Sequence, residues 1–427
     1  MSAGLWKYRI RELSVRGFKS IAEKQSIRIA PLTILAGANS SGKSSMMQPL
    51  LLLKQTLESS FDPGPLWIAG PNVKFTGADQ FLSRARTQNG SKSLDIEIGI
   101  GGNARLGLTF SKTPKTPIDI DEQRWIDDSK RHLIRREWTR EDVRARFKDV
   151  DSVSRERFWL RLVSLKEGDD KMTSSLRSSF VTGVPINFVG EVLQKILHVP
   201  GTRGNPERTY PITGTGPNFP GTFQYYVASV IARWQSENNV NYKYLNGDLQ
   251  HLGLAPKIVA RRLSDAEIDL LVGRLASGKP DDLVSVADVG LGTSHVLPVL
   301  VALRTAVQGQ MVYIEQPEIH LHPRAQVKLV EVLADAARRG VQVVAETHSA
   351  LILTAIQALV AKEELKPELV KLHWFERDPK TGVTKVTPTG LSERGSFSKR
   401  DWPEDFDEVI LTAEREYLDA VTERSSR

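Results

Sequence analysis

The stretch that decides the fold is Gly37-Ala38-Asn39-Ser40-Ser41-Gly42-Lys43-Ser44. It fits the pattern G-x-x-x-x-G-K-[ST], and it lies between the apolar, strand-like run that begins at Leu32 and a segment able to form a helix. In such a loop the backbone N–H groups surround a β-phosphate, the lysine reaches the β/γ oxygens and the last hydroxyl can bind Mg²⁺. The sequence therefore predicts an ATP and Mg²⁺ site. The expected nucleotide-binding residues are Gly37, Asn39, Ser40, Ser41, Gly42, Lys43, Ser44 and Ser45, with Ser44 also a metal ligand.

Two features near this loop lead to further expectations. Lys43 should face solvent, because it has to reach a phosphate. Pro49 follows within the same helix, where it removes a backbone hydrogen bond, so we expect a kink or an early end of the helix there.

Composition limits the function classes. The chain has 427 residues, enough for two or three sub-domains, and no cysteine, which excludes disulfides, Cys-ligated zinc and thiol catalysis. Its apolar runs are shorter than the roughly 20 residues that a membrane span needs, and the N-terminus lacks a signal-peptide pattern. We expect a cytoplasmic protein with no membrane partner.

Alternating and helical patterns divide the chain into four parts. Residues 1–112 should form an N-terminal lobe of antiparallel strands around the phosphate loop, including a hairpin from Leu94 to Phe110. Residues 113–255 should be a mixed, partly helical insertion. Its segment 124–166 carries 13 Lys/Arg against 8 Asp/Glu, which suits either a solvated face or contact with nucleic acid.

Residues 256–362 should form a second lobe with a parallel sheet, because helices and strands alternate there. Residues 363–427 should be a C-terminal extension. The expected elements are helices 265–276, 294–307, 323–339, 351–361 and 407–421, and strands 311–314 and 341–345.

A candidate carboxylate for the metal ion lies at the end of the predicted strand that begins at Met311. Glu315 stands where a P-loop protein places the carboxylate for magnesium, so we predict Glu315 as a metal ligand beside Ser44. The next residues, Gln316-Pro317-Glu318-Ile319-His320-Leu321-His322-Pro323, carry no aspartate or glutamate directly after Glu315.

Together these motifs resemble ABC-superfamily ATPases of the SMC/RecF/OLD-like branch. The segment I-E-Q-P-E-I-H-L-H-P (314–323) resembles their Walker B and D-loop region, V-R-G-F-K-S (15–20) their first strand and turn, and E-T-H-S (346–349) their H-loop. The segment 288–295 lies where the ABC signature is expected. The resemblance implies an α/β ABC-ATPase head and a head-to-tail dimer, in which Gly290, Gly292 and Ser294 of one copy contact the nucleotide of another.

The resemblance also implies catalytic roles. Gln316 occupies the position of the usual catalytic glutamate, and since an amide cannot take a proton, we expect slow hydrolysis unless Glu318 replaces it. His348 would contact the γ-phosphate, and Gln80 is a candidate Q-loop glutamine. We expect no zinc at His320 and His322, since no third ligand accompanies them.

Two functions fit this pattern. The first is an ATPase that dimerises on ATP and regulates or scaffolds an effector encoded nearby, such as a nuclease, in bacterial anti-phage defence. The alternative is an SMC/RecF-like ATPase that binds DNA for repair through its basic insertion. The OLD-type nuclease domain would need more chain than the 79 residues after His348. Hence a nuclease in the same chain is not expected, and a homodimer or higher oligomer with a separate effector is.

Overall fold

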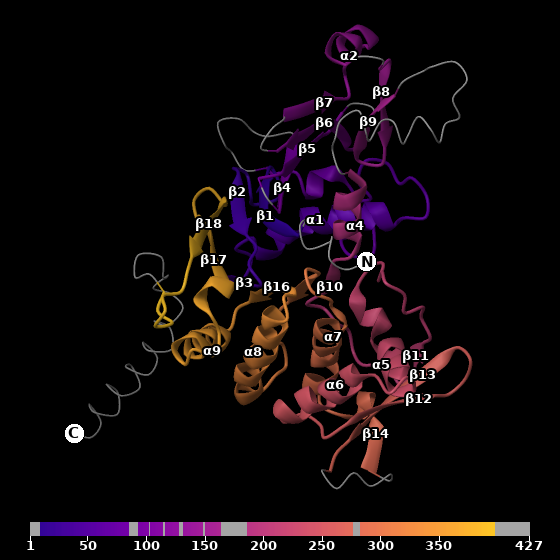
Figure 1. The fold of residues 1–427 in the computed structure, drawn as a ribbon, viewed down its shortest axis with the longest axis vertical. Helices are drawn as coiled ribbons and strands as arrows, with labels where there is room; N and C mark the ends of the chain where they lie inside the picture. Colours follow the sequence, from indigo (N-terminus) through magenta and orange to yellow (C-terminus); the bar gives the residue numbers. More distant parts are fainter. Residues whose placement is uncertain are drawn as a thin grey trace, which may run out of the picture.

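The computed structural model describes residues 9–84, 93–101, 103–113, 116–127, 131–147, 150–163, 186–275 and 282–397. The expected helix 407–421 lies outside these residues. Within them the chain forms a β-rich upper part and a lower part in which helices cover a second sheet (Figure 1). In the described ranges, no helix has both the length and the apolar character that crossing a bilayer requires.

The first sheet has the strand order β2-β1-β4-β5-β6-β7, and its neighbouring strands are antiparallel. Its strands are β1 (Ile10–Arg16), β2 (Gln25–Arg28), β4 (Ser93–Ile100), β5 (Arg105–Ser111), β6 (Asp119–Ile126) and β7 (Arg131–Arg135). The predicted hairpin is confirmed as β4 and β5, which pair from Ser93↔Ser111 to Gly99↔Arg105. Because β6 and β7 belong to the same sheet, the boundary expected at residue 112 falls inside a continuous sheet.

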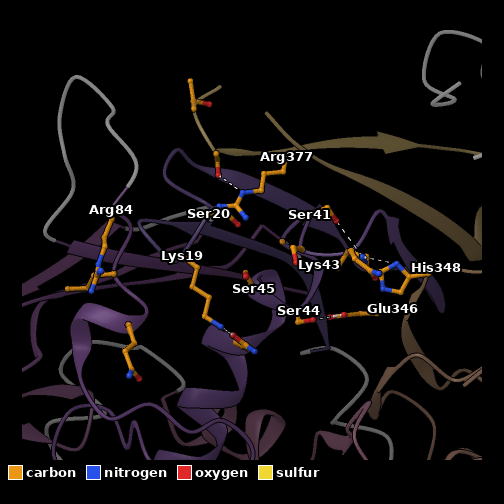
Figure 2. Close-up of a pocket in the computed structure, with 18 of the residues that line it drawn as sticks. Lys19, Ser20, Ser41, Lys43, Ser44, Ser45, Arg84, Glu346, His348 and Arg377 are labelled. Carbon is orange, nitrogen blue, oxygen red and sulfur yellow. Dashed lines mark hydrogen bonds between the residues drawn. The ribbon is translucent and has the colours of Figure 1, made fainter. Parts of the chain in front are cut away.

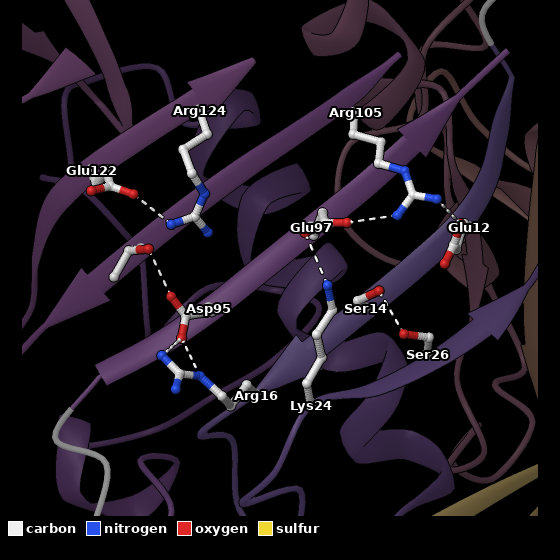
Figure 3. Close-up of polar contacts among 11 residues, drawn as sticks. Glu12, Ser14, Arg16, Lys24, Ser26, Asp95, Glu97, Arg105, Glu122 and Arg124 are labelled. Carbon is white, nitrogen blue, oxygen red and sulfur yellow. Dashed lines mark hydrogen bonds and ion pairs between the residues drawn. The ribbon is translucent and has the colours of Figure 1, made fainter. Parts of the chain in front are cut away.

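The two faces of this sheet differ, as period-2 alternation requires. Leu94, Ile96 and Ile98 of β4 are buried in the core, whereas Asp95 and Glu97 lie on the outer face. There the two carboxylates form ion pairs with basic side chains on or next to neighbouring strands (Figure 3). These pairs are Arg16–Asp95, Lys24–Glu97 and Arg105–Glu97.

The second sheet carries the phosphate loop and has the order β10-β15-β16-β3-β17-β18. Every neighbouring pair in it is parallel except β17–β18, which confirms the predicted parallel core. Its strands are β3 (Leu32–Gly37), β10 (Leu197–Val199), β15 (Met311–Glu315), β16 (Gln342–Thr347), β17 (Val370–Arg377) and β18 (Thr384–Thr389).

Both faces of the parallel sheet are covered, which is why its strands read as almost continuous apolar runs. In β15, Val312 and Ile314 belong to one hydrophobic core, between this sheet and the helices in the lower part of Figure 1. Met311 and Tyr313 belong to the other core, between this sheet and the first sheet. The helices are α1 (Lys43–Glu58), α2 (Arg140–Arg146), α4 (Ile186–Gln194), α5 (Val227–Ser236), α6 (Val240–His251), α7 (Leu291–Thr305), α8 (Pro323–Arg338) and α9 (Ala350–Ala361).

Short elements complete the described chain. β8 (Ser152–Glu156) pairs with β9 (Trp159–Val163), and a small sheet contains β11 (Tyr210–Pro211), β12 (Ile258–Arg262), β13 (Glu267–Gly273) and β14 (Leu283–Ser285). Single turns of 3-10 helix are η2 (Ala78–Gln80), η3 (Phe223–Tyr226), η5 (Val286–Asp288) and η6 (Pro367–Leu369).

One local prediction is wrong, and of the two outcomes expected at Pro49, a kink or an early end, the structure excludes the early end. The helix expected over 265–276 is strand β13, which pairs with β12 through a turn around Asp265, because Ile268, Leu270 and Val272 alternate into the core of the small sheet. The early end expected at Pro49 does not occur, since α1 continues to Glu58 with Leu50–Leu53 buried. Packing of these leucines outweighs the lost hydrogen bond.

Candidate functional site

A cavity of about 1000 Å³ opens at the start of α1, and the phosphate loop forms its floor. Asn39, Ser40, Ser41 and the residues from Gly42 to Ser45, all of them expected to bind nucleotide, line this cavity, and their role in binding stays a prediction. Figure 2 shows Arg84 and Lys19 to the left of the phosphate loop, His348 to its right and Arg377 above it. The expected ligand Gly37 ends β3 and begins this loop, but it is not among the described residues that line the cavity.

Glycine is required at both ends of the loop. Gly37 has φ 146° and Gly42 has φ 104°, in the region that side-chain-bearing residues rarely adopt. A Cβ on Gly37 would lie 2.3 Å from the Phe375 carbonyl oxygen, and one on Gly42 would lie 2.4 Å from Thr384 Oγ1. The loop therefore fits tightly against the β17–β18 hairpin, and Thr384 Oγ1 lies 2.8 Å from the Ser41 carbonyl oxygen.

Lys43 is buried, so the expectation that it faces solvent is wrong. Its side chain is 4% exposed, and Nζ donates to the carbonyl oxygens of Gly37 (2.9 Å) and Ala38 (2.8 Å). These carbonyls satisfy an ammonium that would otherwise be buried without partners. Burial lowers the pKa of Lys43 to about 8, against the opposing charges of Glu346 and Glu318.

His348 joins the predicted H-loop to the phosphate loop. It follows β16, lines the cavity, and its Nδ1 lies 2.9 Å from the Gly37 carbonyl oxygen and 3.4 Å from Lys43 Nζ. Burial, and then the charge of Lys43, lowers the pKa of His348. A neutral ring beside the P-loop lysine is suited to a hydrogen bond with phosphate, and the predicted γ-phosphate contact stays a prediction.

Two carboxylates end neighbouring strands, at the paired positions Glu315 of β15 and Glu346 of β16. Glu346 lines the cavity, and its Oε2 accepts from Ser44 Oγ (2.7 Å). Glu315, the predicted metal ligand, accepts instead from the backbone N–H of Gly201 (3.0 Å), and its Oε1 lies 3.2 Å from His198 Nε2.

The electrostatics of the two carboxylates differ. Burial, and then the neighbouring charge of Glu315, raises the pKa of Glu346 to about 7. The pKa of Glu315 is lowered, although burial opposes this, because the hydrogen bond and charge of His198 and the N–H of Gly201 favour its ionised form. Tyr313 lies between the two, donating to Glu346 and lying 3.4 Å from Glu315 Oε1.

Gln316 and Glu318 have different surroundings. Gln316 lines the cavity, adopts φ 46° and donates its backbone N–H to the Glu346 carbonyl oxygen (2.9 Å). Glu318 is buried, and its Oε1 accepts from Thr347 Oγ1 (2.7 Å) and from the backbone N–H of His348 (3.1 Å). The Glu318 side chain therefore holds the segment that carries His348, and among the described residues it is not one that lines the cavity.

The expected signature residues lie at the start of α7. Gly290 occupies the N-cap position with no side-chain cap, and Ser294 Oγ donates to the Leu291 carbonyl oxygen (3.1 Å). A Cβ on Gly292 would lie 3.0 Å from the His320 carbonyl oxygen, so the D-loop region packs against this helix. None of the three lines the cavity as its described residues define it.

The histidines of the D-loop region have structural contacts. His322 caps α8, its Nδ1 accepting from the Arg324 N–H (3.3 Å), and the His320 ring packs on that of His295, with the ring centroids 4.7 Å apart. Gln80 lies in the cavity wall, but its amide is held by Thr76 through two hydrogen bonds.

Several residues that line the cavity were not predicted as site residues from the sequence. Glu346 was noted only as part of a motif, and Lys19 and Ser20 only as part of a strand and turn. Arg377 and Thr381 come from β17 and the turn after it, in the part expected to be an extension. The signal for Glu346 was available, since it ends a strand of the same sheet as Glu315.

Arg203 was also missed, and it connects the site to α7. This partly buried side chain donates to the carbonyl oxygens of Glu315 (2.6 Å), Gln316 (3.2 Å) and His295 (3.1 Å). Burial lowers its pKa to about 10, so it stays charged at neutral pH.

Comparisons with known proteins agree with a nucleotide site of this kind. Residues 32–354 match the family model described as "AAA domain, putative AbiEii toxin, Type IV TA system". No curated protein matches the chain.

Solved structures similar to the chain are head domains of SMC proteins. An SMC head bound to the C-terminal winged-helix domain of ScpA has a TM-score of 0.46 at 13% identity, covering 90% of this chain and 98% of that one. The SMC head domain from Thermotoga maritima has a TM-score of 0.39 at 12% identity, covering 89% and 98%. An SMC head with an extended coiled coil, bound to the C-terminal domain of ScpA from Pyrococcus furiosus, has a TM-score of 0.42 at 11% identity, covering 90% and 96%.

Proposed function

Since the chain belongs to the AAA-domain family whose model spans residues 32–354, we propose that it is an ATPase that dimerises on ATP and hydrolyses it slowly. We further propose that the ATP-bound dimer regulates or scaffolds a separate effector in bacterial anti-phage defence. The effector class that we expect is a nuclease.

One observation is the main support for the proposed nucleotide site. Lys43, Ser44 and His348 meet in one cavity at the N-terminus of the 16-residue helix α1. A helix N-terminus and a buried ammonium attract an anion, and a cavity of about 1000 Å³ is large enough for a nucleotide. Mg²⁺, when bound, would neutralise phosphate charge during transfer, and Ser44 with a nearby carboxylate would hold it.

Dimerisation is supported by the start of α7. Its N-terminus has no side-chain cap, Leu291 is 38% exposed, and a Cβ added to Gly290 would meet no atom within 4 Å. Such a helix start offers free N–H groups to an anion. In the proposed head-to-tail dimer this anion is the γ-phosphate of ATP bound to the second copy.

Slow turnover follows from Gln316. Its amide can orient water but cannot accept a proton, while Lys43, Mg²⁺ and the second copy's α7 would still stabilise the charge of the transition state. The ATP-bound dimer would then persist long enough to hold an effector. The link to defence rests on the family, which is described as a putative toxin of a type IV toxin–antitoxin system.

The test combines ATP binding with molar mass in solution. Lys43→Ala should weaken ATP binding about 10–100-fold, the equivalent of about 1.5–3 kcal/mol for a charge-assisted hydrogen bond. Ser294→Arg should keep ATP binding, measured by calorimetry, but abolish the ATP-dependent dimer measured by light scattering.

Ser236→Arg is the matched control. Ser236 is also an exposed helical serine whose Oγ donates to a carbonyl oxygen three residues earlier, that of Arg233 (3.0 Å). This variant should dimerise as the unmodified chain does. If Ser294→Arg removes ATP binding itself, α7 only packs the core and the two-copy site is wrong.

Two further measurements distinguish the regulation of an effector from DNA binding for repair. Purification of the chain with its neighbouring gene products, with ATP and with ADP, should give a complex only with ATP. DNA affinity that falls steeply with salt would favour the repair function instead. The basic segment argues for the effector, because many of its arginines are already paired with acids. These are Arg124 and Arg135 with Glu122, Arg136 with Asp119, and Arg140 and Arg144 with Asp151.

A further inference from the structure

The contacts of Ser44 point to a metal-binding residue that its motif alone does not reveal. Ser44 lies in the first turn of α1, and its hydroxyl donates to Glu346 Oε2 at 2.7 Å (Figure 2). Glu346 is 3% exposed, lines the cavity, and comes from the end of β16. The hydroxyl expected to bind Mg²⁺ therefore already touches a carboxylate, and that carboxylate is not Glu315.

The side chain of Glu315 is held elsewhere. Both of its oxygens contact groups from β10 and the loop after it, which are His198 Nε2 (3.2 Å) and the N–H of Gly201 (3.0 Å). His198, which is buried, in turn lies 3.0 Å from Asn72 Oδ1, so the Glu315 carboxylate is held by a chain of contacts that leads away from Ser44. Turning it toward Ser44 would break two hydrogen bonds and leave His198 and Gly201 without an acceptor, which is costly inside a protein.

The charge at this point also favours a cation. Glu315 and Glu346 occupy paired positions on adjacent strands, and Tyr313 contacts both. One of these carboxylates is buried and the other is partly buried, so their charges repel each other, and a divalent cation relieves this. Carboxylate and hydroxyl oxygens are ligands that Mg²⁺ accepts, and it commonly takes one or two carboxylates together with the phosphates of its substrate.

The described residues contain no group of three or more His, Cys, Asp or Glu side chains able to hold a metal ion by themselves. The nucleotide would therefore supply the remaining ligands. We propose that Glu346, rather than Glu315, is the carboxylate that holds the divalent cation of the nucleotide beside Ser44. This inference rests on the proposed ATP site and names its metal-binding residue.

The test uses Mn²⁺ as the probe, with paramagnetic resonance to count the bound ion in the presence and absence of ATP. Glu346→Gln keeps the size of the side chain and removes its charge. It should weaken Mn²⁺ binding in the ATP complex about 10–100-fold, the effect typical of a lost metal-supporting group. ATP affinity measured with EDTA should not fall.

Two other variants make the result specific. Glu315→Gln should retain most of the Mn²⁺ affinity. Glu331→Gln removes one half-exposed carboxylate of α8 and controls for net charge. If Glu346→Gln does not fold, Glu346→Asp keeps the charge but shortens its reach, and it should bind Mn²⁺ with intermediate affinity.

The outcomes distinguish this inference from the proposed function. Loss of Mn²⁺ in Glu315→Gln with full retention in Glu346→Gln overturns the inference and leaves the ATP site intact. Absence of ATP binding to the unmodified chain, with or without Mn²⁺, overturns the proposed function itself.

Discussion

At the scale of single residues, Gln316 and Glu318 in the segment after β15 differ in their contacts and in whether they line the cavity. Gln316 lines the cavity, whereas Glu318 accepts hydrogen bonds from Thr347 and from the backbone of His348. Glu318 Oε2 has no partner among the described side-chain and backbone groups. A carboxylate in this position can orient the histidine segment, and it is not among the described residues that line the cavity.

The first prediction concerns hydrolysis at Gln316. Gln316→Glu should raise kcat about tenfold or more, because a general base contributes about 10²–10⁴-fold and the left-handed backbone already aims this position at the cavity. Single-turnover phosphate release with Mg·ATP measures it, and the ATP-bound dimer should become shorter-lived.

Glu318→Gln is the comparison for this experiment. The amide oxygen can still accept from His348 N–H, so kcat should change much less than with Gln316→Glu. If Glu318→Gln abolishes turnover while Gln316→Glu has no effect, Glu318 is the base and the assignment of slow turnover to Gln316 is wrong.

At the scale of elements, the loop after β10 joins two parts of the site. Arg203 of this loop donates to the carbonyl oxygens of Glu315 and Gln316 at the end of β15 and of His295 in α7. The side chain of His295 also contacts this loop, since its Nε2 lies 2.9 Å from the Gly204 carbonyl oxygen. The nucleotide cavity and the exposed start of α7 are thus connected through one short loop.

The second prediction is that Arg203→Ala weakens this connection. The loss of hydrogen bonds to a charged, partly buried group should lower the free energy of unfolding by about 1.5–3 kcal/mol. It should also reduce ATP-dependent dimerisation more than ATP affinity, because α7 loses its support while the phosphate loop does not. Urea unfolding, calorimetry and light scattering measure the three quantities.

Arg208→Ala provides the control within the same loop. Arg208 pairs with Asp288, but its side chain is 73% exposed, and exposed pairs contribute little. Equal effects of the two variants would mean that the loop contributes only general packing.

At the scale of the whole molecule, the two large sheets are joined by a buried histidine as well as by α1. His373 of β17 is 1% exposed, and its Nε2 lies 2.9 Å from the carbonyl oxygen and 3.1 Å from the backbone nitrogen of Arg28 in β2. Burial lowers the pKa of His373 to about 4 from an ordinary 6.5, and the charges of Lys371 and Arg28 act in the same direction. The folded protein therefore requires the neutral ring.

The third prediction is the pH dependence that this causes. Above pH 6.5 His373 is neutral in both states, while between pH 6.5 and about 4 only the unfolded chain binds the proton, so stability falls as pH falls through this range. The loss attributable to this residue should approach roughly 3 kcal/mol at its acid end. His373→Gln should flatten that part of the urea-unfolding profile, and His251→Gln, at a half-exposed histidine paired with Glu331, should not.

The sequence by itself determined those features that depend on neighbouring residues. The glycines of the phosphate loop, the alternation in β4 and β5, and helices α7, α8 and α9 were predicted within a few residues, because backbone conformation and periodicity are local properties. The likeness of the motifs to ABC-type ATPases predicted the order of the nucleotide site along the chain.

Only the tertiary structure decided the features that join distant segments. It made the predicted helix 265–276 a strand, because β12 and β14 were available to pair with it, and it carried α1 past Pro49, because two sheets enclose its leucines. It buried Lys43 under its own loop and brought Glu346 to Ser44, 302 residues away. No local pattern encodes such a contact, because its free energy arises only after the parallel strands pair and exclude water between them.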